Sequence, residues 1–312
     1  MNNDEVNEIV QPSFTSEPSI QTEKHGWWYD HPYNRLNVKD YVRQFCGWKA
    51  LTELIQLIYD EKQKAFFVTL FLTGGRVTEV LLLMKSNFEV ERNVVEVTDM
   101  RLLKKYKKLD EYIDPVTGKP RWHTEKFTRF RKPFTIQRRE PFTPILEAWI
   151  KKTKDSKIVN DPKKKPSDVY LFPSPQSHSR RYMKNLFLSE KAKTKVNWYV
   201  PDANGEIPYT LQWAYLIIRD VNNRASQGLK KRLGLLIPFR DKEGKKIADE
   251  IHLFLHWFRS QRASQLAKDY KLGVPELVDL FEWEDMKTAI RYAKMGGETL
   301  TEKMSKARVQ YV

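Results

Sequence analysis

The sequence predicts a mainly α-helical protein with one small antiparallel β-sheet. Three observations support this fold class. From residue 46 onward, apolar residues recur with the spacing of helices that bury one face. Only two short stretches, 93–98 and 131–136, read as strands. With 312 residues, of which 40% are hydrophobic, the chain is long enough for one large domain or two modest ones around a buried core.

Two segments precede the first helix. Residues 1–24 are polar, acidic and without periodicity, so we expect a flexible tail, and the aromatic-rich residues 25–45 predict an ordered N-terminal arm. The buried face of the first helix is formed by Leu51, Leu54, Ile55 and Ile58. A second helix is predicted over 61–72, and Gly74-Gly75 then makes a tight turn before a short helix that runs to Met84.

The sheet and the remaining helices follow. The β-branched stretch 93–98 (NVVEVT) predicts a strand, and 131–136 (RKPFTI) predicts its returning partner after a long basic excursion. Three helices are then expected, at 144–153, near 210–225 and near 248–269. Pro275 suits the first residue of a further helix. Asp285 suits the N-cap of the helix that carries Tyr292.

The charge of the chain indicates a polyanionic partner. The chain has 55 Lys and Arg against 40 Asp and Glu, a formal charge of +15. Residues 1–24 have a net charge of −4, so the other 288 residues hold 54 basic and 35 acidic side chains, a net charge of +19. A field of this sign favours nucleic acid over a generic basic surface, with a membrane surface well behind.

Several classes of protein are disfavoured. No apolar run reaches the length of a membrane span, and the N-terminus lacks the basic start and apolar core of a signal peptide. The single cysteine, Cys46, cannot form an internal disulfide or a cysteine-based zinc site. GxxxxGK, GxGxxG, HExxH and zinc-like histidine spacings are absent. We therefore expect a cytoplasmic, nucleoid-associated protein without a metal or cofactor.

The remaining candidates are polar residues in helices that otherwise bury apolar faces. Arg76 follows Thr73-Gly74-Gly75, and Glu79 lies three residues later on the same helix face. Far downstream, His256 and Arg259 share another face. Arginine presents a planar fork of donors that matches two oxygens of a phosphate diester. Alone, each of these residues would be an ordinary surface or salt-bridged side chain, but together they would form a phosphate site.

Two segments resemble signatures of the tyrosine recombinases, the phage-integrase family. TGGRVTEVLLLMKSNFE, which contains Arg76, resembles the first signature, T-G-x-R-x-x-E-L. HWFRSQRASQL, which contains His256 and Arg259, resembles the second, H-x-x-R followed by a helix of small residues.

Two further segments extend the resemblance. LGVPELVDLFEWEDMKTAIRYAKM resembles the third signature, in which a His or Trp precedes the nucleophilic tyrosine by nine residues, as Trp283 precedes Tyr292. YLFPS, at 170–174, resembles the family's segment between the sheet and the second signature. The four segments keep the family's order within residues 46–294. The resemblance implies a tyrosine-recombinase catalytic domain fold there.

The resemblance also implies roles for the site residues. Arg76 and Arg259 would clamp the scissile phosphate and stabilise its pentacoordinate transition state, in place of a metal. His256 would hydrogen-bond the phosphate and assist proton transfer, and Trp283 would donate its indole N–H to a phosphate oxygen. Tyr292 would attack phosphorus and hold the DNA end as a 3′-phosphotyrosine. Because that bond conserves the energy of the diester, religation would need no ATP.

The other implied residues support this site. Glu79 would orient Arg76. A lysine on a β-hairpin would protonate the leaving 5′ oxygen: Lys104 is our choice, Lys105 is nearly as suitable, and Lys107 and Lys132 remain open. DNA backbone contacts are expected from Lys105, Lys107, Lys108, Arg180, Arg181, Lys230 and Lys231.

The sequence departs from the family at its N-terminal side. Most members have a separate helical DNA-clamping domain before the catalytic domain, whereas only 45 residues precede position 46 here. We expect the arm 25–45 and the basic insertions to replace it. The tail 295–312 is expected to pack on a neighbouring subunit, in a dimer-to-tetramer synapse on double-stranded DNA.

The resulting hypothesis is a site-specific recombinase or mobile-element integrase. Two alternatives stay open: a DNA-binding protein of the same fold without catalysis, and a basic RNA-binding protein whose aromatic and lysine residues suit single strands.

Overall fold

The computed structural model describes residues 44–113, 120–175, 200–236 and 252–296, and the strand backbones at 21–22 and 25–26. Side chains within these ranges are described from residue 44 onward, except those of 103–128 and 293–296. The predicted tail 1–24, arm 25–45 and C-terminal tail therefore lie largely outside the described residues.

The helices and strands in chain order are β1 (Gln21–Thr22), β2 (His25–Gly26), α4 (Trp48–Gln56), α5 (Glu61–Thr73), α6 (Val77–Leu81), the 3-10 helix η1 (Lys85–Asn87), β3 (Phe88–Val90), β4 (Val94–Val97), β5 (Arg101–Ile113), β6 (Pro120–Phe130), β7 (Phe134–Gln137), α7 (Thr143–Lys152), α9 (Leu211–Arg224), α10 (Gln227–Arg232), α11 (Leu255–Asp269), α12 (Val274–Phe281) and α13 (Met286–Gly296). This confirms the predicted fold class, mainly α with a small antiparallel sheet.

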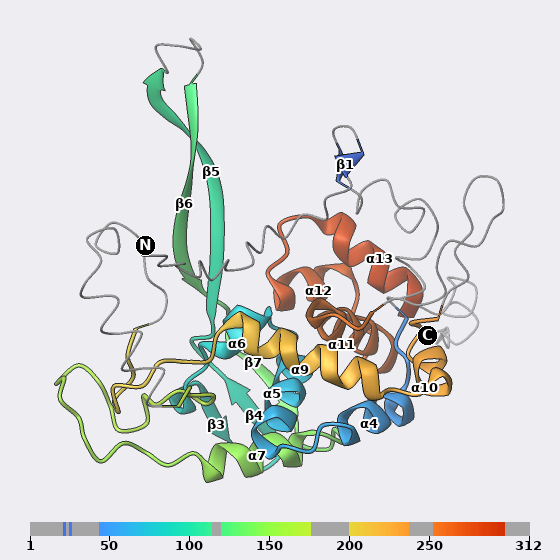
Figure 1. Ribbon diagram of the computed structural model, residues 1–312, viewed down its shortest axis with the longest axis horizontal. Coiled ribbons are helices and arrows are strands. Elements are labelled where there is room, and N and C mark those ends of the chain that lie inside the picture. Colours follow the sequence, from blue (N-terminus) through green and yellow to red (C-terminus); the bar gives the residue numbers. More distant parts are fainter. Residues whose placement is uncertain are drawn as a thin grey trace, which may run out of the picture.

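Helix α5 forms the centre of the body, with α4, α7 and α11 packed around it (Figure 1). The nine residues Ala65–Thr73 are all buried, which is typical of a helix that is apolar on every side. The helix starts at Asp60, whose carboxylate accepts the backbone N–H of Gln63 at 2.8 Å. Its bounds confirm the helix predicted at 61–72. The short helix that follows ends at Leu81 rather than Met84.

The sheet has three antiparallel strands in the order β3-β4-β7. Strand β4 confirms the prediction at 93–98. The returning strand begins at Phe134 rather than at residue 131, because Pro133 has no N–H to give to a ladder. Val95 and Ile136, which pair in the register, are buried against the helices.

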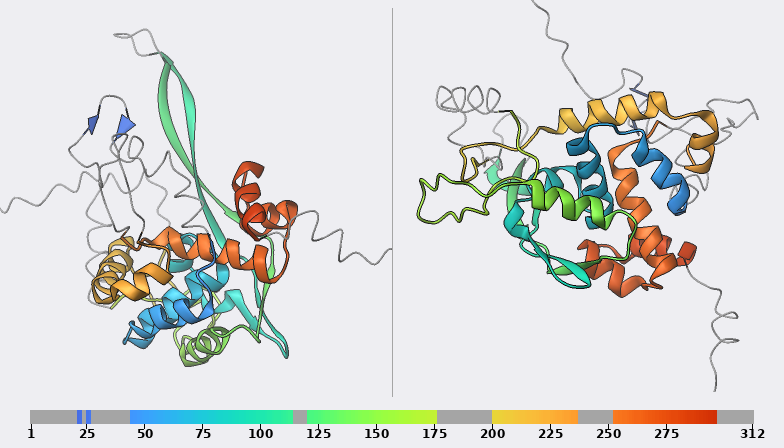
Figure 2. Two further views of the ribbon diagram at one scale, coloured as in Figure 1. Left: turned by 90° about the vertical axis from the view of Figure 1, so that its right-hand side faces the viewer. Right: turned by 90° about the horizontal axis from the view of Figure 1, so that it is seen from below.

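The basic excursion between β4 and β7 is a long antiparallel hairpin, β5–β6, which the sequence did not predict. It projects away from the helices in Figure 1 and in the left view of Figure 2. Its register runs from Arg101 opposite Phe130 to Ile113 opposite Pro120. Thirteen residues of strand extend about 40 Å. The alternation that marks a half-buried strand is missing from its lysine-rich sequence, so periodicity could not find it.

The C-terminal helices carry the remaining candidate site residues. Helix α9 confirms the helix near 210–225, whereas α10 was not predicted. Helix α11 begins at Leu255 because the backbone of Phe254, its N-cap, is extended. Pro275 is the second residue of α12 rather than the first. Asp285 precedes α13 and its carboxylate accepts the backbone N–H of Lys287 at 2.7 Å, as expected of the cap. Within the described residues, no helix is both long and apolar enough to cross a membrane.

Candidate active site

The turn after α5 needs two glycines because two other segments pack directly against it. Gly74 ends α5 in the left-handed conformation, with φ of +57°. A Cβ on Gly74 would lie 2.5 Å from Cε1 of Phe281, and a Cβ on Gly75 would lie 2.3 Å from Cε of Met100. The absence of side chains thus lets the end of α12 and the base of the β5–β6 hairpin close on this turn.

Arg76 follows the turn and is held by Glu79. Its backbone N–H donates to Oε2 of Glu79 at 2.7 Å, and its Nη1 donates to Oε1 at 2.8 Å. The Glu79 side chain is fully buried, whereas 41% of the Arg76 side chain is exposed. One carboxylate therefore caps helix α6 and orients a guanidinium that still reaches solvent. This is the orienting contact that the i, i+3 spacing predicts.

Arg259 reaches the same turn from α11. Its Nη1 donates to the carbonyl of Gly74 at 2.6 Å, and its Nη2 donates to the carbonyl of Phe281 at 2.8 Å. The residue is 2% exposed, and its guanidinium lies 4.9 Å from the Phe281 ring and 5.7 Å from the Trp283 ring. Hydrogen bonds from a charged donor are worth about 1.5–3 kcal/mol each. They hold this arginine in one position.

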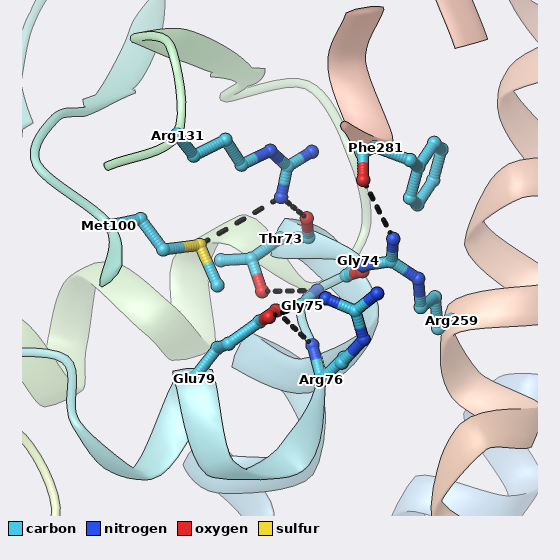
Figure 3. A network of polar contacts seen from close by, with 9 residues as sticks. All are labelled: Thr73, Gly74, Gly75, Arg76, Glu79, Met100, Arg131, Arg259 and Phe281. Carbon is cyan, nitrogen blue, oxygen red and sulfur yellow. Dashed lines mark hydrogen bonds and ion pairs between the residues drawn. The ribbon is translucent and has the colours of Figure 1, made fainter. Parts of the chain in front are cut away.

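The electrostatics of Arg259 link the site residues. Burial lowers the pKa of Arg259 to about 10, and the Arg76 charge acts in the same direction. The charge of Glu79 acts in the opposite direction and favours the guanidinium cation, as would a phenolate at Tyr292. Figure 3 shows Arg76 and Arg259 around the Thr73–Arg76 turn, each coming from a different helix.

Tyr292 lies on α13 beside this cluster. Its ring stacks on Trp283 at 5.3 Å, and Trp283 stacks on Phe281 at 4.7 Å. The hydroxyl of Tyr292 donates to Oγ of Ser260 at 3.1 Å, and the tyrosine is 4% exposed. Because Ser260 follows Arg259 in α11, the phenol lies at the same helical turn as the arginine. Trp283 is partly exposed and forms the middle of the aromatic stack.

His256 lies one turn before Arg259 on α11 and is exposed, whereas the residues around it on this helix are buried. The structure therefore brings Arg76, Glu79, Arg259, Trp283 and Tyr292 into direct or linked contact. It places His256 one turn away at the surface of the same helix, exposed where Arg259 is buried.

Arg131 is a site residue that the sequence analysis missed. It lies between β6 and β7, is 3% exposed, and donates from Nη1 to the carbonyl of Thr73 at 2.7 Å. Arg131 and Arg259 thus bond successive carbonyls of one turn (Figure 3). In the sequence this arginine is one of many in a basic stretch. Only its position just before Lys132-Pro133, where the strand ladder is interrupted, sets it apart.

The lysines considered as proton donors to the leaving 5′ oxygen lie on β5 and just after β6. Lys104 lies in β5, opposite Phe127 in the register. The side chains of Lys104, Lys105, Lys107 and Lys108 are outside the described part of the chain. Lys132 is exposed and ion-paired with Asp279 of α12, and this hydrogen bond raises the pKa of its ammonium group.

Of the other predicted DNA contacts, one is exposed, one is buried and two lie outside the described residues. Lys231 is exposed on α10, whereas Lys230 is buried. Arg180 and Arg181 lie outside the described residues. Among the side chains that the structure describes, no group of three or more His, Cys, Asp or Glu could hold a metal ion.

Comparison with known proteins gives structural likeness only. No protein-family model matches the sequence, and no curated protein matches it significantly. The structure is similar to the XerH site-specific recombinase bound to difH substrate in a pre-cleavage complex. The identity is 14%, the TM-score 0.39, and the match covers 86% of this chain and 51% of that chain.

It is also similar to the Tn1549 transposon integrase in complex with circular intermediate DNA. Here the identity is 14% and the TM-score 0.42, with 83% of this chain and 64% of that chain covered. With transposon right end DNA, the same integrase gives 13% identity and a TM-score of 0.43. The chain spans about half the length of the XerH chain. At this level of similarity, any assignment of function has to rest on the geometry of the site.

Proposed function

We propose that this chain is a site-specific DNA recombinase or integrase of the tyrosine recombinase type. It would cleave and rejoin DNA through a 3′-phosphotyrosine intermediate, without ATP or metal. One observation carries the proposal. Arg76 and Arg259, which are distant in sequence, meet at one turn, and the hydroxyl of Tyr292 is bonded to the residue that follows Arg259.

The proposed chemistry assigns a task to each group. The phenolic oxygen of Tyr292 forms a bond to phosphorus while the bond from phosphorus to the 5′ oxygen breaks. The phenolic proton leaves with help from His256, and a lysine, Lys104 in the first instance, gives a proton to the leaving 5′ oxygen. Arg76 and Arg259 hold the non-bridging oxygens as negative charge develops. Attack by the free 5′ hydroxyl on the phosphotyrosine reverses every step.

The indole N–H of Trp283 would donate to one phosphate oxygen, and Glu79 would keep Arg76 in position. The position of Trp283 between Phe281 and Tyr292, with its ring 5.7 Å from the Arg259 guanidinium, supports this placement. Attack also requires the Tyr292 hydroxyl to leave its hydrogen bond with Ser260. Such a bond contributes about 1 kcal/mol net, which is a small part of a chemical barrier.

The proposal extends to partners and domains. Residues 46–294 would form the catalytic domain, the arm 25–45 would take part of the place of a clamp domain, and 295–312 would reach a neighbouring subunit. The protein would assemble from dimer to tetramer on double-stranded DNA in the cytoplasm, at the nucleoid. The backbone contacts proposed are Lys105, Lys107, Lys108, Arg180, Arg181 and Lys231; Lys230, which the sequence also suggested, is buried and is no longer proposed. The affinity for duplex should then fall steeply with salt, with a slope of about −0.9 per phosphate neutralised.

The test is a covalent complex. The protein is incubated with nicked suicide duplexes that tile the DNA flanking its gene, and the products are separated on a denaturing gel. We expect a protein–DNA band that vanishes in Tyr292→Phe and persists in Tyr215→Phe, a matched change at an exposed tyrosine of α9. Arg259→Lys should weaken the band strongly while duplex affinity is largely kept.

Other outcomes distinguish the alternatives. Duplex binding without a covalent band in the wild type would indicate a DNA-binding protein that lacks catalysis. A preference for single-stranded RNA over duplex DNA would indicate the RNA-binding alternative. A band that survives in Tyr292→Phe would remove Tyr292 as the nucleophile.

A further inference from the structure

Arg131 lies where the hairpin joins the body. It directly follows β6, and its backbone N–H donates to the carbonyl of Met100, the residue before β5, at 2.8 Å. Arg131 and Met100 therefore close the base of the β5–β6 hairpin. The side chain of Arg131 then leaves this base and enters the site. Its Nη1 contacts both the carbonyl of Thr73, at 2.7 Å, and Sδ of Met100, at 3.8 Å.

The Arg131 side chain also touches the aromatic wall of the site. Its guanidinium lies 4.1 Å from the ring of Phe134 on β7 and 5.6 Å from the ring of Phe281 on α12. Phe281 in turn accepts a hydrogen bond from Arg259 and packs against Gly74. One side chain thus connects the hairpin base, the central sheet, the end of α12 and the turn before Arg76 (Figure 3).

Arg131 occupies this place at an energetic cost. Burial lowers its pKa to about 9, and the nearby charges of Arg259 and Arg262 act in the same direction, whereas the charges of Glu79 and Glu282 offset part of this effect. Its Nε and Nη2 are buried and have no hydrogen-bond partner among the residues that the structure describes. Well-packed apolar residues of similar volume often stabilise a core as well as or better than buried charges do. Stability alone therefore does not account for a guanidinium here.

We infer that Arg131 is a positioning residue that couples the β5–β6 hairpin to the turn carrying Arg76. This inference rests on the proposed function and deepens it: the partner that engages the hairpin is the same DNA duplex whose phosphate lies in the site. The hairpin strands carry eight basic and three acidic residues, and a two-stranded ribbon fits the major groove of B-DNA. When DNA binds the hairpin, its base shifts, and Arg131 transmits the shift to the carbonyl of Thr73 and hence to Arg76.

The test is a double-mutant cycle on the full chain. One change is Arg131→Met. The other shortens the hairpin by replacing residues 107–124 with Asn-Gly, which joins Tyr106 to Glu125 where they face each other in the register and keeps Lys104. Single-turnover formation of the covalent complex is measured at saturating duplex, together with the dissociation constant and the melting temperature.

We expect Arg131→Met to slow cleavage by about 10- to 100-fold at saturating duplex, while the dissociation constant changes less than 3-fold. In the shortened-hairpin background, the same substitution should have little further effect, because the coupling is already lost. Arg131→Lys keeps one donor for the Thr73 carbonyl and should restore part of the rate. If Arg131→Met does not fold, Arg131→Lys takes its place in the cycle. Arg138→Met is the control, since Arg138 binds Glu147 on the surface at the far end of β7.

Three results would overturn the inference while leaving the proposed function intact. The first is that Arg131→Met cleaves DNA at the wild-type rate when it is assayed at a temperature well below its melting temperature. The second is an additive loss, in which Arg131→Met slows cleavage equally in both backgrounds. The third is a loss of rate in Arg131→Lys as complete as in Arg131→Met. A wild-type protein that forms no covalent complex would instead contradict the proposed function.

Discussion

Glu79 is the anion on which the site depends, and its replacement by glutamine gives the sharpest test of the geometry. The carboxylate is fully buried and accepts two hydrogen bonds from Arg76, one from the backbone N–H and one from Nη1. Glutamine has the same shape but only one acceptor. Its amide N–H₂ would face one of the two donors, so Glu79→Gln leaves at least one buried donor without a partner.

The expected loss follows from these contacts. An unpaired buried donor costs about 1–3 kcal/mol, and a hydrogen bond to a charged group is worth about 1.5–3 kcal/mol. The Glu79 charge also favours the cations of the buried Arg131 and Arg259. Because Arg76 is partly exposed, part of its loss is recovered by water. We therefore expect a destabilisation of roughly 2–4 kcal/mol, or a fall in melting temperature on the order of 5–10 °C.

A matched control exists in the same chain. Glu147 binds Arg138 through both oxygens, at 2.6 and 2.8 Å, but at the surface, where the Arg138 side chain is 41% exposed. Glu147→Gln should destabilise far less, because ion pairs at the surface contribute little to stability. Thermal unfolding of both variants, followed by far-UV circular dichroism, makes the comparison. If Glu147→Gln lowers the melting temperature as much as Glu79→Gln does, burial of the Glu79 contact does not govern its strength, and the reasoning fails.

Three further predictions concern single residues. Gly74→Ala should destabilise the protein by about 2–4 kcal/mol, because the new methyl group adds left-handed backbone strain and clashes with Phe281. Gly205 also has a positive φ, +73°, but open space around it, so Gly205→Ala should cost only about 1–2 kcal/mol. Equal losses of stability in chemical denaturation would rule out the clash with Phe281. Burial and the hydrogen bond to Glu140 raise the pKa of Tyr270 to about 12 from 10.0. The folded chain then keeps a proton that the unfolded chain loses, so stability should fall between pH 10 and 12, and less so in Tyr270→Phe; parallel pH profiles of melting temperature would contradict this. Burial raises the pKa of the Cys46 thiol to about 12 from 9.0. Alkylation of this thiol at pH 8 should therefore be about 1,000-fold slower in the native than in the unfolded protein. Equal labelling of both states, measured by mass spectrometry, would contradict this prediction.

Local patterns explain which parts of the fold could be predicted. The helix at 61–73 follows from an acidic N-cap, a continuous apolar stretch and a glycine stop, all within a few residues of each other. The β5–β6 hairpin does not, because the sequences of its strands lack the apolar alternation on which strand prediction depends. The short helix α10 was missed because six residues show less than two turns of periodicity.

Within the site, too, contacts between residues close in sequence could be predicted and contacts between distant segments could not. The pairing of Arg76 with Glu79 is an i, i+3 contact and can be read from spacing alone. The bond from Arg259 to Gly74 joins distant segments, and the sequence indicated it only through a resemblance between motifs. Arg131 could not be found at all. Its importance lies in a backbone carbonyl that it reaches across the fold, and carbonyl positions leave no trace in residue types.

The charge balance of the turn explains why these contacts also point to function. Among the groups bonded at this turn, Arg76, Arg131 and Arg259 bring three positive charges and Glu79 brings one negative charge, a net of +2; the charge of Glu282 also favours the Arg131 cation. Nε of Arg259 and two nitrogens of Arg131 are buried without hydrogen-bond partners among the described residues. A fold selected for stability alone would neutralise or remove such an excess. In the proposed function, a phosphate diester would supply both the negative charge and acceptors for this cluster, and its binding would offset the repulsion between the guanidinium groups. The repulsion at this turn would then be the counterpart of an affinity for the DNA backbone.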